Sequence, residues 1–239
     1  MMLVTCEHGG NEIPDAYRAL FSGHQALLET HRGFDAGALC VARDFAGAFG
    51  APLFSATTSR LLIDLNRSLG HPKVFSNISR LLPAAERAVV IEKYYVPYRS
   101  QVEQAVNAAL QTHDQVIHIS SHSFTPVLNG VERTADIGLL YDPRRERERQ
   151  FSARWKAALN ARAPALRVRR NYPYAGSDDG LTSHLRKRLP GERYLAIELE
   201  VNQLWVEAGG TAWSELRRTL VETLHVACAA WSAEHAPSG

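Results

Sequence analysis

Cysteine is scarce in this sequence, and its spacing excludes the common cysteine-based scaffolds. The 239 residues include three cysteines, Cys6, Cys40 and Cys228, which lie far apart in the chain. Their odd number argues against a disulfide framework, and the absence of a CxxC pair excludes a zinc ribbon. Because the N-terminus also lacks the basic and apolar regions of a secretory signal, we expect a cytoplasmic protein with reduced thiols.

Long apolar runs and an excess of charge of one sign are also missing. No run approaches the length that spans a bilayer, so we expect no membrane contact. The formal net charge of +2 is too small to indicate nucleic-acid binding. An apolar content of 45% without a break in composition predicts a single domain over residues 1–239, with a frayed tail from 234 onward. No feature of the sequence indicates an oligomeric state.

Several familiar catalytic motifs are absent as well. The chain contains no P-loop, GxGxxG, HExxH or GxSxG pattern. These absences argue against nucleotide binding, zincin chemistry and a serine-hydrolase nucleophile elbow.

Apolar, β-rich runs alternate with helical patterns, which is typical of an α/β sandwich with a mixed, mainly parallel sheet. The expected strands are Leu3–Cys6, Pro52–Ala56, Leu61–Leu65, Val116–Ser120, Asp136–Tyr141, Leu166–Arg169 and Tyr194–Val201. The expected helices are Asp35–Phe49, Ala84–Thr112 with a bend at Pro97, Arg144–Arg162 and Ala212–Glu234. Sites in such sheets collect at strand ends and in the loops that follow them.

Two histidines lie in one expected strand and its exit, in the run VIHISSHSFTP (116–126). His118 and His122 would share a face, but at ~3.3 Å per residue they would be roughly 13 Å apart. One metal ion cannot bind both unless the strand bends. We therefore predict a structural role for His118. His122, at the strand's end among hydroxyl residues, is as consistent with a metal-binding or catalytic role as with a structural one.

Acidic residues alternate with aliphatic ones in the run IELEV (197–201). Glu198 and Glu200 share one face of this expected strand, a pattern that a solvated strand also produces. The continuously apolar start of the strand, Tyr194–Ala196, favours a buried strand instead. A carboxylate in a buried strand needs a metal, a proton or an arginine as partner, and beside metal-bound water it can act as a general base.

Arginines bracket an apolar run in SRLLIDLNRS (59–68), where either one could simply pair with Asp64. Arg60 and Arg67 could also bind a substrate carboxylate in bidentate fashion, with Arg133 as a third such side chain. Histidines, carboxylates and arginines at strand ends together indicate metal-assisted hydrolysis of an anionic substrate.

Two loops complete the set of unusual segments. In VTCEHGGNEIP (4–14), the first strand carries His8 to the strand ends, Gly9–Gly10 allow tight turning, and Asn11 can bond to the site. The turn-rich loop NYPYAGSDDG (171–180) is either a connector or the wall of a pocket.

Taken in order along the chain, these motifs resemble the N-formylglutamate amidohydrolase (N-formylglutamate deformylase) family. The resemblance rests on CEHGGNEIP (6–14), HRGFDAGA (31–38), SRLLIDLNRS (59–68), SHSFTP (121–126), RTADIGLLYD (133–142), NYPYAGSDDG (171–180) and ELEVNQ (198–203). It implies a three-layer α/β/α fold related to the zinc carboxypeptidases and aspartoacylases. It also implies zinc-dependent cleavage of N-formyl-L-glutamate into formate and glutamate.

The resemblance further implies a metal site with one zinc ion per chain. His8 and His122 match the family's histidine positions. An asparagine stands where the carboxypeptidase relatives have the glutamate of a His-x-x-Glu pair. We therefore expect Asp35 to be the carboxylate ligand, with Glu12 and Glu7 as alternatives. Manganese, iron or cobalt would suit the same ligands.

The catalytic and substrate-binding roles are assigned on the same resemblance. Glu200 best matches the family's acidic strand-end position and would be the general base, with Glu198 as the second choice. The side chains expected to bind a small anionic N-acyl amino acid are Arg60, Asn66, Arg67, Arg133, Asn171 and Tyr174.

The chain departs from the family pattern at two positions. Ser120 stands where members have an aspartate two residues before the second histidine, and Glu7 stands where many have a proline. Hydrolysis of a different small N-acyl or amide substrate is therefore the second hypothesis. A catalytically inactive, ligand-binding protein of this fold is the third.

Overall fold

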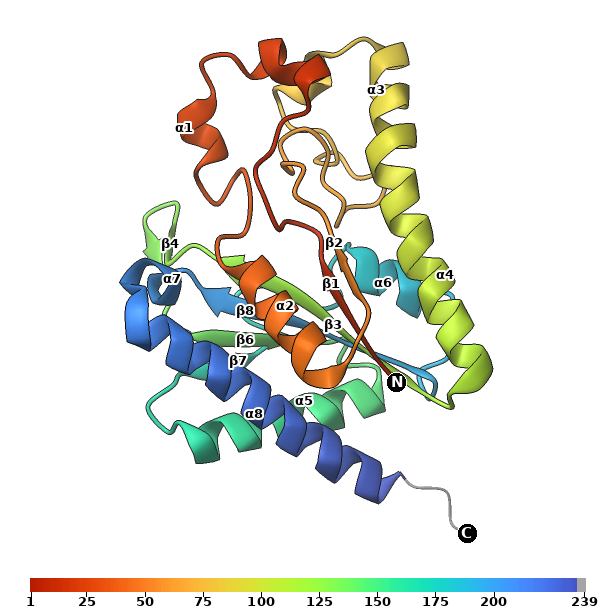
Figure 1. Cartoon of the computed structure of the whole chain (residues 1–239), viewed down its shortest axis with the longest axis vertical. Coiled ribbons are helices and arrows are strands. Elements are labelled where there is room, and N and C mark those ends of the chain that lie inside the picture. Colours follow the sequence, from red (N-terminus) through yellow and green to blue (C-terminus); the bar gives the residue numbers. More distant parts are fainter. Residues whose placement is uncertain (236–239) are drawn as a thin grey trace.

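The computed structural model describes residues 1–235 and contains a six-stranded sheet between two layers of helices (Figure 1). The strands of this sheet are β1 (Met2–Cys6), β2 (Leu53–Ser55), β3 (Val116–Phe124), β6 (Ile137–Leu140), β7 (Val168–Arg170) and β8 (Tyr194–Asn202). A separate two-stranded hairpin consists of β4 (Val127–Leu128) and β5 (Val131–Glu132).

The sheet has the strand order β2-β1-β3-β8-β6-β7. β2, β1, β3 and β8 are parallel, β6 runs antiparallel to β8, and β7 is parallel to β6. The mixed, mainly parallel sheet predicted from the sequence is therefore confirmed. Because β1, β3 and β8 are parallel, their carboxyl ends lie at one edge of the sheet.

Helices cover both faces of the sheet, which confirms the three-layer architecture (Figure 1). The α-helices are α1 (Gln25–Leu28), α2 (Ala38–Phe49), α3 (Ala84–Val90), α4 (Val96–Thr112), α5 (Glu146–Arg162), α6 (Leu181–Arg186), α7 (Leu204–Ala208) and α8 (Gly210–Glu234). Two 3₁₀ segments, η1 (Asp15–Phe21) and η2 (Ser79–Leu81), lie in the long connections on either side of β2.

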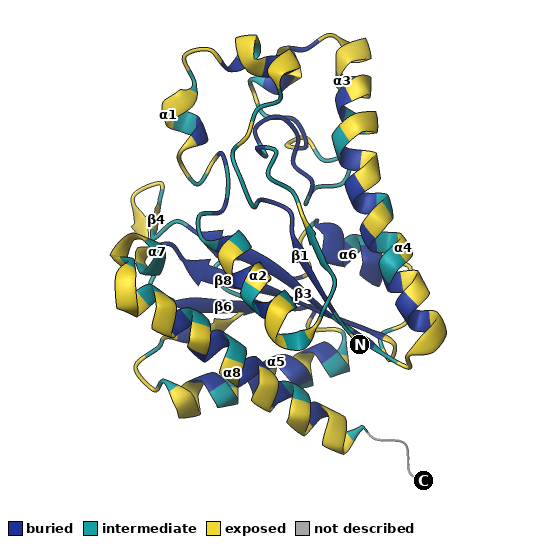
Figure 2. Ribbon diagram, in the orientation of Figure 1, coloured by how far each residue is buried: buried dark blue, intermediate teal, exposed yellow. Residues whose placement is uncertain are grey.

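Each face of the sheet has its own hydrophobic core. Phe45 of α2, Trp155 of α5 and Leu220 of α8 are buried against one face, and Val102 of α4 and Leu185 of α6 belong to the core of the other. Figure 2 shows the inner sides of these helices and the central strands as buried. Burial of each large apolar side chain contributes roughly 1.5–3 kcal/mol, so both layers stabilise the sheet that holds the strand ends in place.

The long helix expected over Ala84–Thr112 is present, but its irregularity precedes Pro97. A π-helical turn, η3 (Ile91–Tyr95), joins α3 to α4, and the Val96 amide donates to the Ile91 carbonyl. Proline has no amide hydrogen and its ring clashes with the carbonyl four residues earlier, so a widened turn before Pro97 lets the helix continue.

The prediction of a strand at Leu61–Leu65 is wrong. Leu61 and Leu62 lie in one turn and Leu65 in a second, and none of these residues belongs to a strand, although the apolar side chains are buried as the pattern suggested. Local side chains take the backbone partners that a strand would need. The Ser59 hydroxyl accepts from the Leu61 amide, and the Asp64 carboxylate accepts from the Asn66 amide. Serine and aspartate favour turns by this kind of bond.

Other elements differ from expectation mainly at their ends. β3 continues to Phe124, so His122 lies inside the strand, two residues before its last residue. The expected tail begins at Glu234, which ends α8, and residues 236–239 lie outside the described part of the chain. Among residues 1–235, no helix combines the length and the apolar character that crossing a membrane requires.

The glycines after His8 are required for close packing. A Cβ on Gly10 would lie 2.7 Å from the Thr57 carbonyl oxygen, and one on Gly9 would lie 3.0 Å from that of Ala56. Neither glycine has a positive φ. The chain turns at Glu7 and His8 and bends at Gly9, as expected, and the two glycines allow close approach to the segment after β2.

His118 is a core residue, as predicted. It is fully buried on β3, with Nε2 2.8 Å from the Thr5 hydroxyl and Nδ1 2.6 Å from the Tyr194 hydroxyl. Burial lowers the pKa of His118 from 6.5 to about 4.

We expect His118 to weaken the fold in acid. The unfolded chain binds a proton near pH 6.5, whereas the folded chain resists it down to about pH 4. The contribution of His118 is therefore fully present above pH 6.5 and is lost as pH falls through this window, by on the order of 3 kcal/mol. Urea unfolding between pH 7 and pH 4 should show a shallower loss of stability in His118→Gln than in wild type. Equal slopes would contradict this assignment.

Candidate metal centre and active site

The carboxyl ends of β1, β3 and β8 meet at a small cavity of ≈130 Å³. Among its lining residues, His8 follows β1, His122 lies near the end of β3, and Glu200 lies on β8 beside His122. Asp35, in the loop before α2, also lines the cavity. The parallel strands thus bring together residues that are far apart in the sequence.

Three buried side chains form a group that could hold a metal ion. Ligand atoms of His8, Asp35 and His122 all lie within 4.8 Å of one another. Asp35 Oδ2 is 3.3 Å from His8 Nδ1 and 2.8 Å from His122 Nδ1. The Nδ1 atoms of both imidazoles therefore face the same carboxylate oxygen, which makes these two nitrogens the candidate donors.

The Nε2 atom of each histidine lies within hydrogen-bond distance of a different buried carboxylate. His8 Nε2 lies 2.7 Å from Asp64 Oδ1, and His122 Nε2 lies 3.0 Å from Glu7 Oε2. Histidines that bind metals commonly donate their other ring N–H to a carboxylate in this way. The donor set and its supporting acceptors fit a divalent metal ion.

Arg60 supplies the positive charge that this acidic cluster needs. Its guanidinium donates to Asp35 Oδ1 (3.2 Å) and to Asp64 Oδ2 (2.9 Å). Burial alone would raise the pKa of both carboxyls, but the charge of His8 at Asp35 and of Arg60 at Asp64 holds each pKa below its usual range. Arg60 is thus engaged by two carboxylates, and only its remaining N–H groups can face a substrate.

The two glutamates on β8 have different surroundings. Glu198 accepts a hydrogen bond from the Thr182 hydroxyl and lies 4.0 Å from Arg186. Glu200 is 5% exposed, and its Oε2 has no hydrogen-bond partner among the described residues. Burial raises the pKa of Glu200 to about 8, against the opposing charge of His122.

Arg67 and Asn66 line the wall of the cavity opposite the strands. Arg67 Nη1 donates to the Asp179 carbonyl (2.7 Å), and Asn66 Oδ1 accepts from the Leu181 amide (2.8 Å). Within residues 1–235, Arg67 makes no ion pair with a carboxylate, unlike Arg60. Its guanidinium keeps donors for a ligand.

Two of the residues expected to bind substrate lie behind the cavity wall. Arg133 Nη1 donates to the Tyr174 hydroxyl (3.0 Å), and it is Tyr174 that lines the cavity. Asn171 Oδ1 accepts from the amides of Tyr141 (2.9 Å) and Gly176 (3.1 Å). Arg133 therefore supports a wall residue, and Asn171 shapes the loop that forms the wall.

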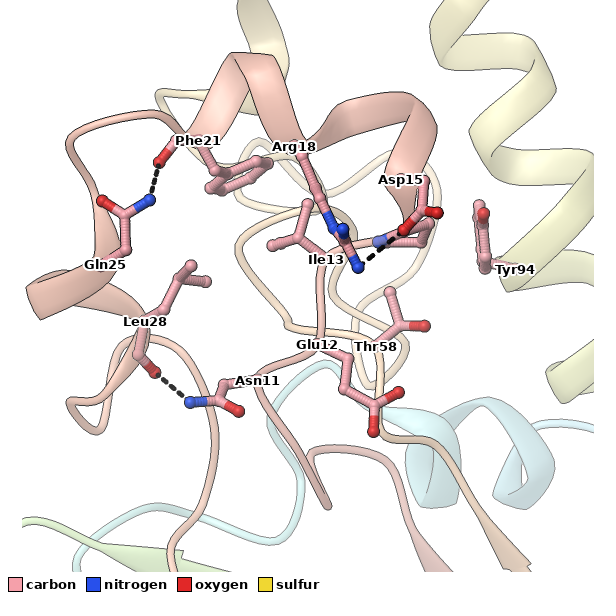
Figure 3. A pocket seen from close by; sticks show the side chains of 11 residues that line it. Asn11, Glu12, Ile13, Asp15, Arg18, Phe21, Gln25, Leu28, Thr58 and Tyr94 are labelled. Atoms are coloured by element: carbon pink, nitrogen blue, oxygen red, sulfur yellow. Dashed lines mark hydrogen bonds and ion pairs between the residues drawn. The ribbon is translucent and has the colours of Figure 1, made fainter.

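A second and wider cavity, ≈660 Å³, lies away from these residues (Figure 3). Asn11 lines it and donates to the Leu28 carbonyl (3.3 Å), so the expected bond from Asn11 to the His8 site is wrong. Glu12 lines the same cavity and accepts from the Thr57 hydroxyl (2.8 Å). Of the carboxylates considered as a third ligand, Asp35 is the one that faces both histidines.

Several residues that hydrogen-bond to the site could not be recognised as such from the sequence. Asp64 lies in a recognised motif, but its two flanking arginines suggested an ion pair and not a bond to His8. Tyr98, which donates to Glu7, and Thr182, which donates to Glu198, lie in helices whose local pattern is ordinary. Their roles depend on which strand end each helix reaches.

Comparisons with known proteins agree with this architecture. The family model described as N-formylglutamate amidohydrolase matches residues 1–205. A solved gene product of Agrobacterium tumefaciens is similar at 29% identity and a TM-score of 0.80, covering 97% of this chain and 91% of that chain. An N-formylglutamate amidohydrolase from Ralstonia eutropha is similar at 21% identity and a TM-score of 0.72, covering 95% and 93%. No curated protein gives a significant match.

We expect Arg60→Met to destabilise the metal-free protein, because it leaves Asp35 and Asp64 buried without their arginine. Removing one partner of a largely buried ion pair should cost about 2–4 kcal/mol. The matched control is Arg67→Met, which breaks no carboxylate pair and should cost less than about 1 kcal/mol. Urea unfolding in the presence of a chelator measures both. Equal losses in the two variants would show that Arg60 does not hold this cluster together.

Proposed function

This chain belongs to the N-formylglutamate amidohydrolase family, and from that premise we propose that it is a metal-dependent hydrolase of N-formyl-L-glutamate or a closely related N-acyl amino acid. The family supports hydrolysis of an amide bond. The observation that carries the metal-dependent proposal is the buried His8–Asp35–His122 group beside a buried glutamate with an unpartnered oxygen. The products would be a carboxylate, formate in the first case, and a free amino acid.

Zinc is the metal that we propose for this group. Catalytic zinc sites commonly combine three protein ligands, drawn from histidine and carboxylate side chains, with an open position. His8, Asp35 and His122 supply such a set, and the bonds to Asp64 and Glu7 favour a free lone pair on each Nδ1. Manganese, iron or cobalt could occupy the same ligands.

Glu200 is the proposed general base. When bound, zinc supplies a Lewis acid and lowers the pKa of coordinated water toward ~7. Glu200 then accepts the proton of the attacking water and passes it to the leaving nitrogen. Its unpartnered Oε2 leaves it free for that transfer, and the positive charge of a bound metal would favour the ionised form that burial alone disfavours. Glu198, by contrast, is already bonded to Thr182.

The substrate would be held from the opposite wall. We assign one carboxylate of the substrate to Arg67, with Asn66 beside it, because Arg67 keeps free donors. Tyr174 forms the outer wall, supported by Arg133. We assign the remaining N–H groups of Arg60 to stabilisation of the developing oxyanion.

A different N-acyl amino acid is the second candidate substrate. Asp178 and Asp179 line the cavity beside Arg67, and Arg60 is already paired with two carboxylates. The wall therefore offers a single unpaired guanidinium to a substrate that, in N-formyl-L-glutamate, carries two carboxylates. Comparing N-acyl amino acids that carry one and two carboxylates separates these candidates.

We expect purified wild type to bind about one zinc ion per chain and to hydrolyse N-formyl-L-glutamate or a related N-formyl amino acid. His122→Ala should lose both, because it removes one donor of the proposed metal group. Metal content is measured by elemental analysis, and hydrolysis by formate release. If zinc binds but no hydrolysis is detected, the metal-site assignment stands and the enzyme assignment is overturned.

Glu200→Gln is the control that separates chemistry from metal binding. It should keep the metal while kcat falls by about 10²–10⁴, the usual contribution of a general base. Full activity in this variant would move the role to Glu198.

Arg67→Lys should raise KM more than it lowers kcat, because lysine retains the charge but loses the bidentate geometry. The loss of one charge-assisted hydrogen bond predicts roughly a tenfold increase in KM. Steady-state kinetics on the best N-formyl substrate measure the effect. An unchanged KM would remove Arg67 from the substrate site.

A further inference from the structure

Glu7 is a buried, charged side chain that contacts the candidate metal ligand His122 through one of its carboxylate oxygens. It is 1% exposed, and its Oε1 accepts from the Tyr98 hydroxyl (2.9 Å). Its Oε2 accepts from the Ser120 hydroxyl (2.8 Å) and lies 3.0 Å from His122 Nε2. Burying a carboxylate is costly unless it is paired and hydrogen-bonded, so this arrangement calls for a reason beyond packing.

Glu7 lies on the side of His122 that faces away from the candidate metal group. His122 Nδ1 is directed at Asp35 Oδ2 (2.8 Å), and the two ring nitrogens point in different directions. Glu7 therefore cannot share a metal ion with Nδ1 of the same ring, and Asp35 is the carboxylate positioned to be the third ligand.

We propose that Glu7 is a positioning residue for the metal ligand His122, holding the imidazole proton on Nε2 so that Nδ1 presents its lone pair to the metal. The inference rests on the proposed function of this site. A neutral imidazole carries one proton, and the bond made by the other nitrogen decides which nitrogen is free to bind a metal. A carboxylate on Nε2 also raises the basicity of the donor nitrogen.

Ser120 and Tyr98 orient the Glu7 carboxylate by donating a hydrogen bond to each of its oxygens. The single hydroxyl hydrogen of Ser120 is given to Glu7 Oε2, while its oxygen lies 3.0 Å from His122 Nε2. Ser120 thus bridges the carboxylate and the imidazole. The Tyr98 hydroxyl, from α4, holds the other oxygen of Glu7. Glu7 and Ser120 are the two positions at which the sequence departs from the family pattern, and in the structure they are in direct contact.

The test is metal affinity measured without substrate. Cobalt(II) binding, followed by its visible absorption and by competition with a chelator, should be 10–100-fold weaker in Glu7→Gln than in wild type. The glutamine keeps the shape but removes the charge that favours the Nε2–H form. The cobalt spectrum should also change, because the orientation of the His122 ring is less restricted.

Glu148→Gln is the matched control. Glu148 is fully buried and pairs with Arg186 (2.9 Å), but it makes no contact with His122. This variant should lose stability while its cobalt affinity stays within about twofold of wild type. A loss of affinity equal to that of Glu7→Gln would overturn the proposal, because it would show a general effect of weakening the fold.

Second-site variants test the geometry itself. Ser120→Asp in the Glu7→Gln background returns a carboxylate to the neighbourhood of His122 Nε2 and should recover most of the lost affinity. If Glu7→Gln does not fold, Tyr98→Phe decides, because it removes one donor to Glu7 and should weaken cobalt binding by about two- to tenfold.

The outcomes separate this inference from the proposed function. Unchanged cobalt affinity in folded Glu7→Gln, or in Tyr98→Phe where that variant decides, overturns the inference and leaves the hydrolase assignment standing. Cobalt binding by wild type without hydrolysis of any N-formyl amino acid overturns the hydrolase assignment, while the affinities still test Glu7. A wild-type protein that binds no divalent ion overturns both.

Discussion

The pairing of buried charges is the constraint on which the rest of the site depends. Asp35, Asp64 and Glu7 are almost entirely buried, and each is kept ionised by histidine or arginine partners. Each carboxylate therefore has a defined position relative to His8 or His122. Glu200 is the exception, since burial raises its pKa and one oxygen has no partner among the described residues. A buried carboxylate left without a partner is characteristic of a site that acts on a ligand.

The parallel sheet makes this pairing possible. Strands β1, β3 and β8 are neighbours that end at one edge, and the register places His122 directly beside Glu200. The antiparallel β6 closes the other side of β8, with Gly138 opposite Glu200. A Cβ on Gly138 would lie 2.0 Å from the Tyr172 carbonyl oxygen, so glycine there lets the loop that bears Tyr174 approach the sheet. The same strands thus position the metal group and the wall that faces it.

Much of this could be predicted before the structure was known. Alternating patterns indicated the mixed sheet and most of its strands, and strand-end chemistry pointed to His8, His122 and Glu200. The error at Leu61–Leu65 has a clear origin, because an apolar run reports burial and not backbone conformation. Arg133 and Asn171 show that residue type likewise does not reveal which partner a side chain contacts in the fold. Their residue types suit carboxylate or amide binding, but each is already engaged by Tyr174 or by the loop backbone.

The sequence by itself determined the kinds of group available and their order along the chain: imidazoles and carboxylates after apolar strands, and arginines around a third apolar run. It also determined the family to which those motifs correspond. Only the tertiary structure decided which groups meet. Three features depend on contacts between distant segments: Asp64 supports His8, Glu7 and Ser120 meet at His122, and Arg60 is paired with two carboxylates whereas Arg67 is paired with none among residues 1–235. Hydrogen bonds and ion pairs act over a few ångströms, so only the folded arrangement of the strands and loops specifies them.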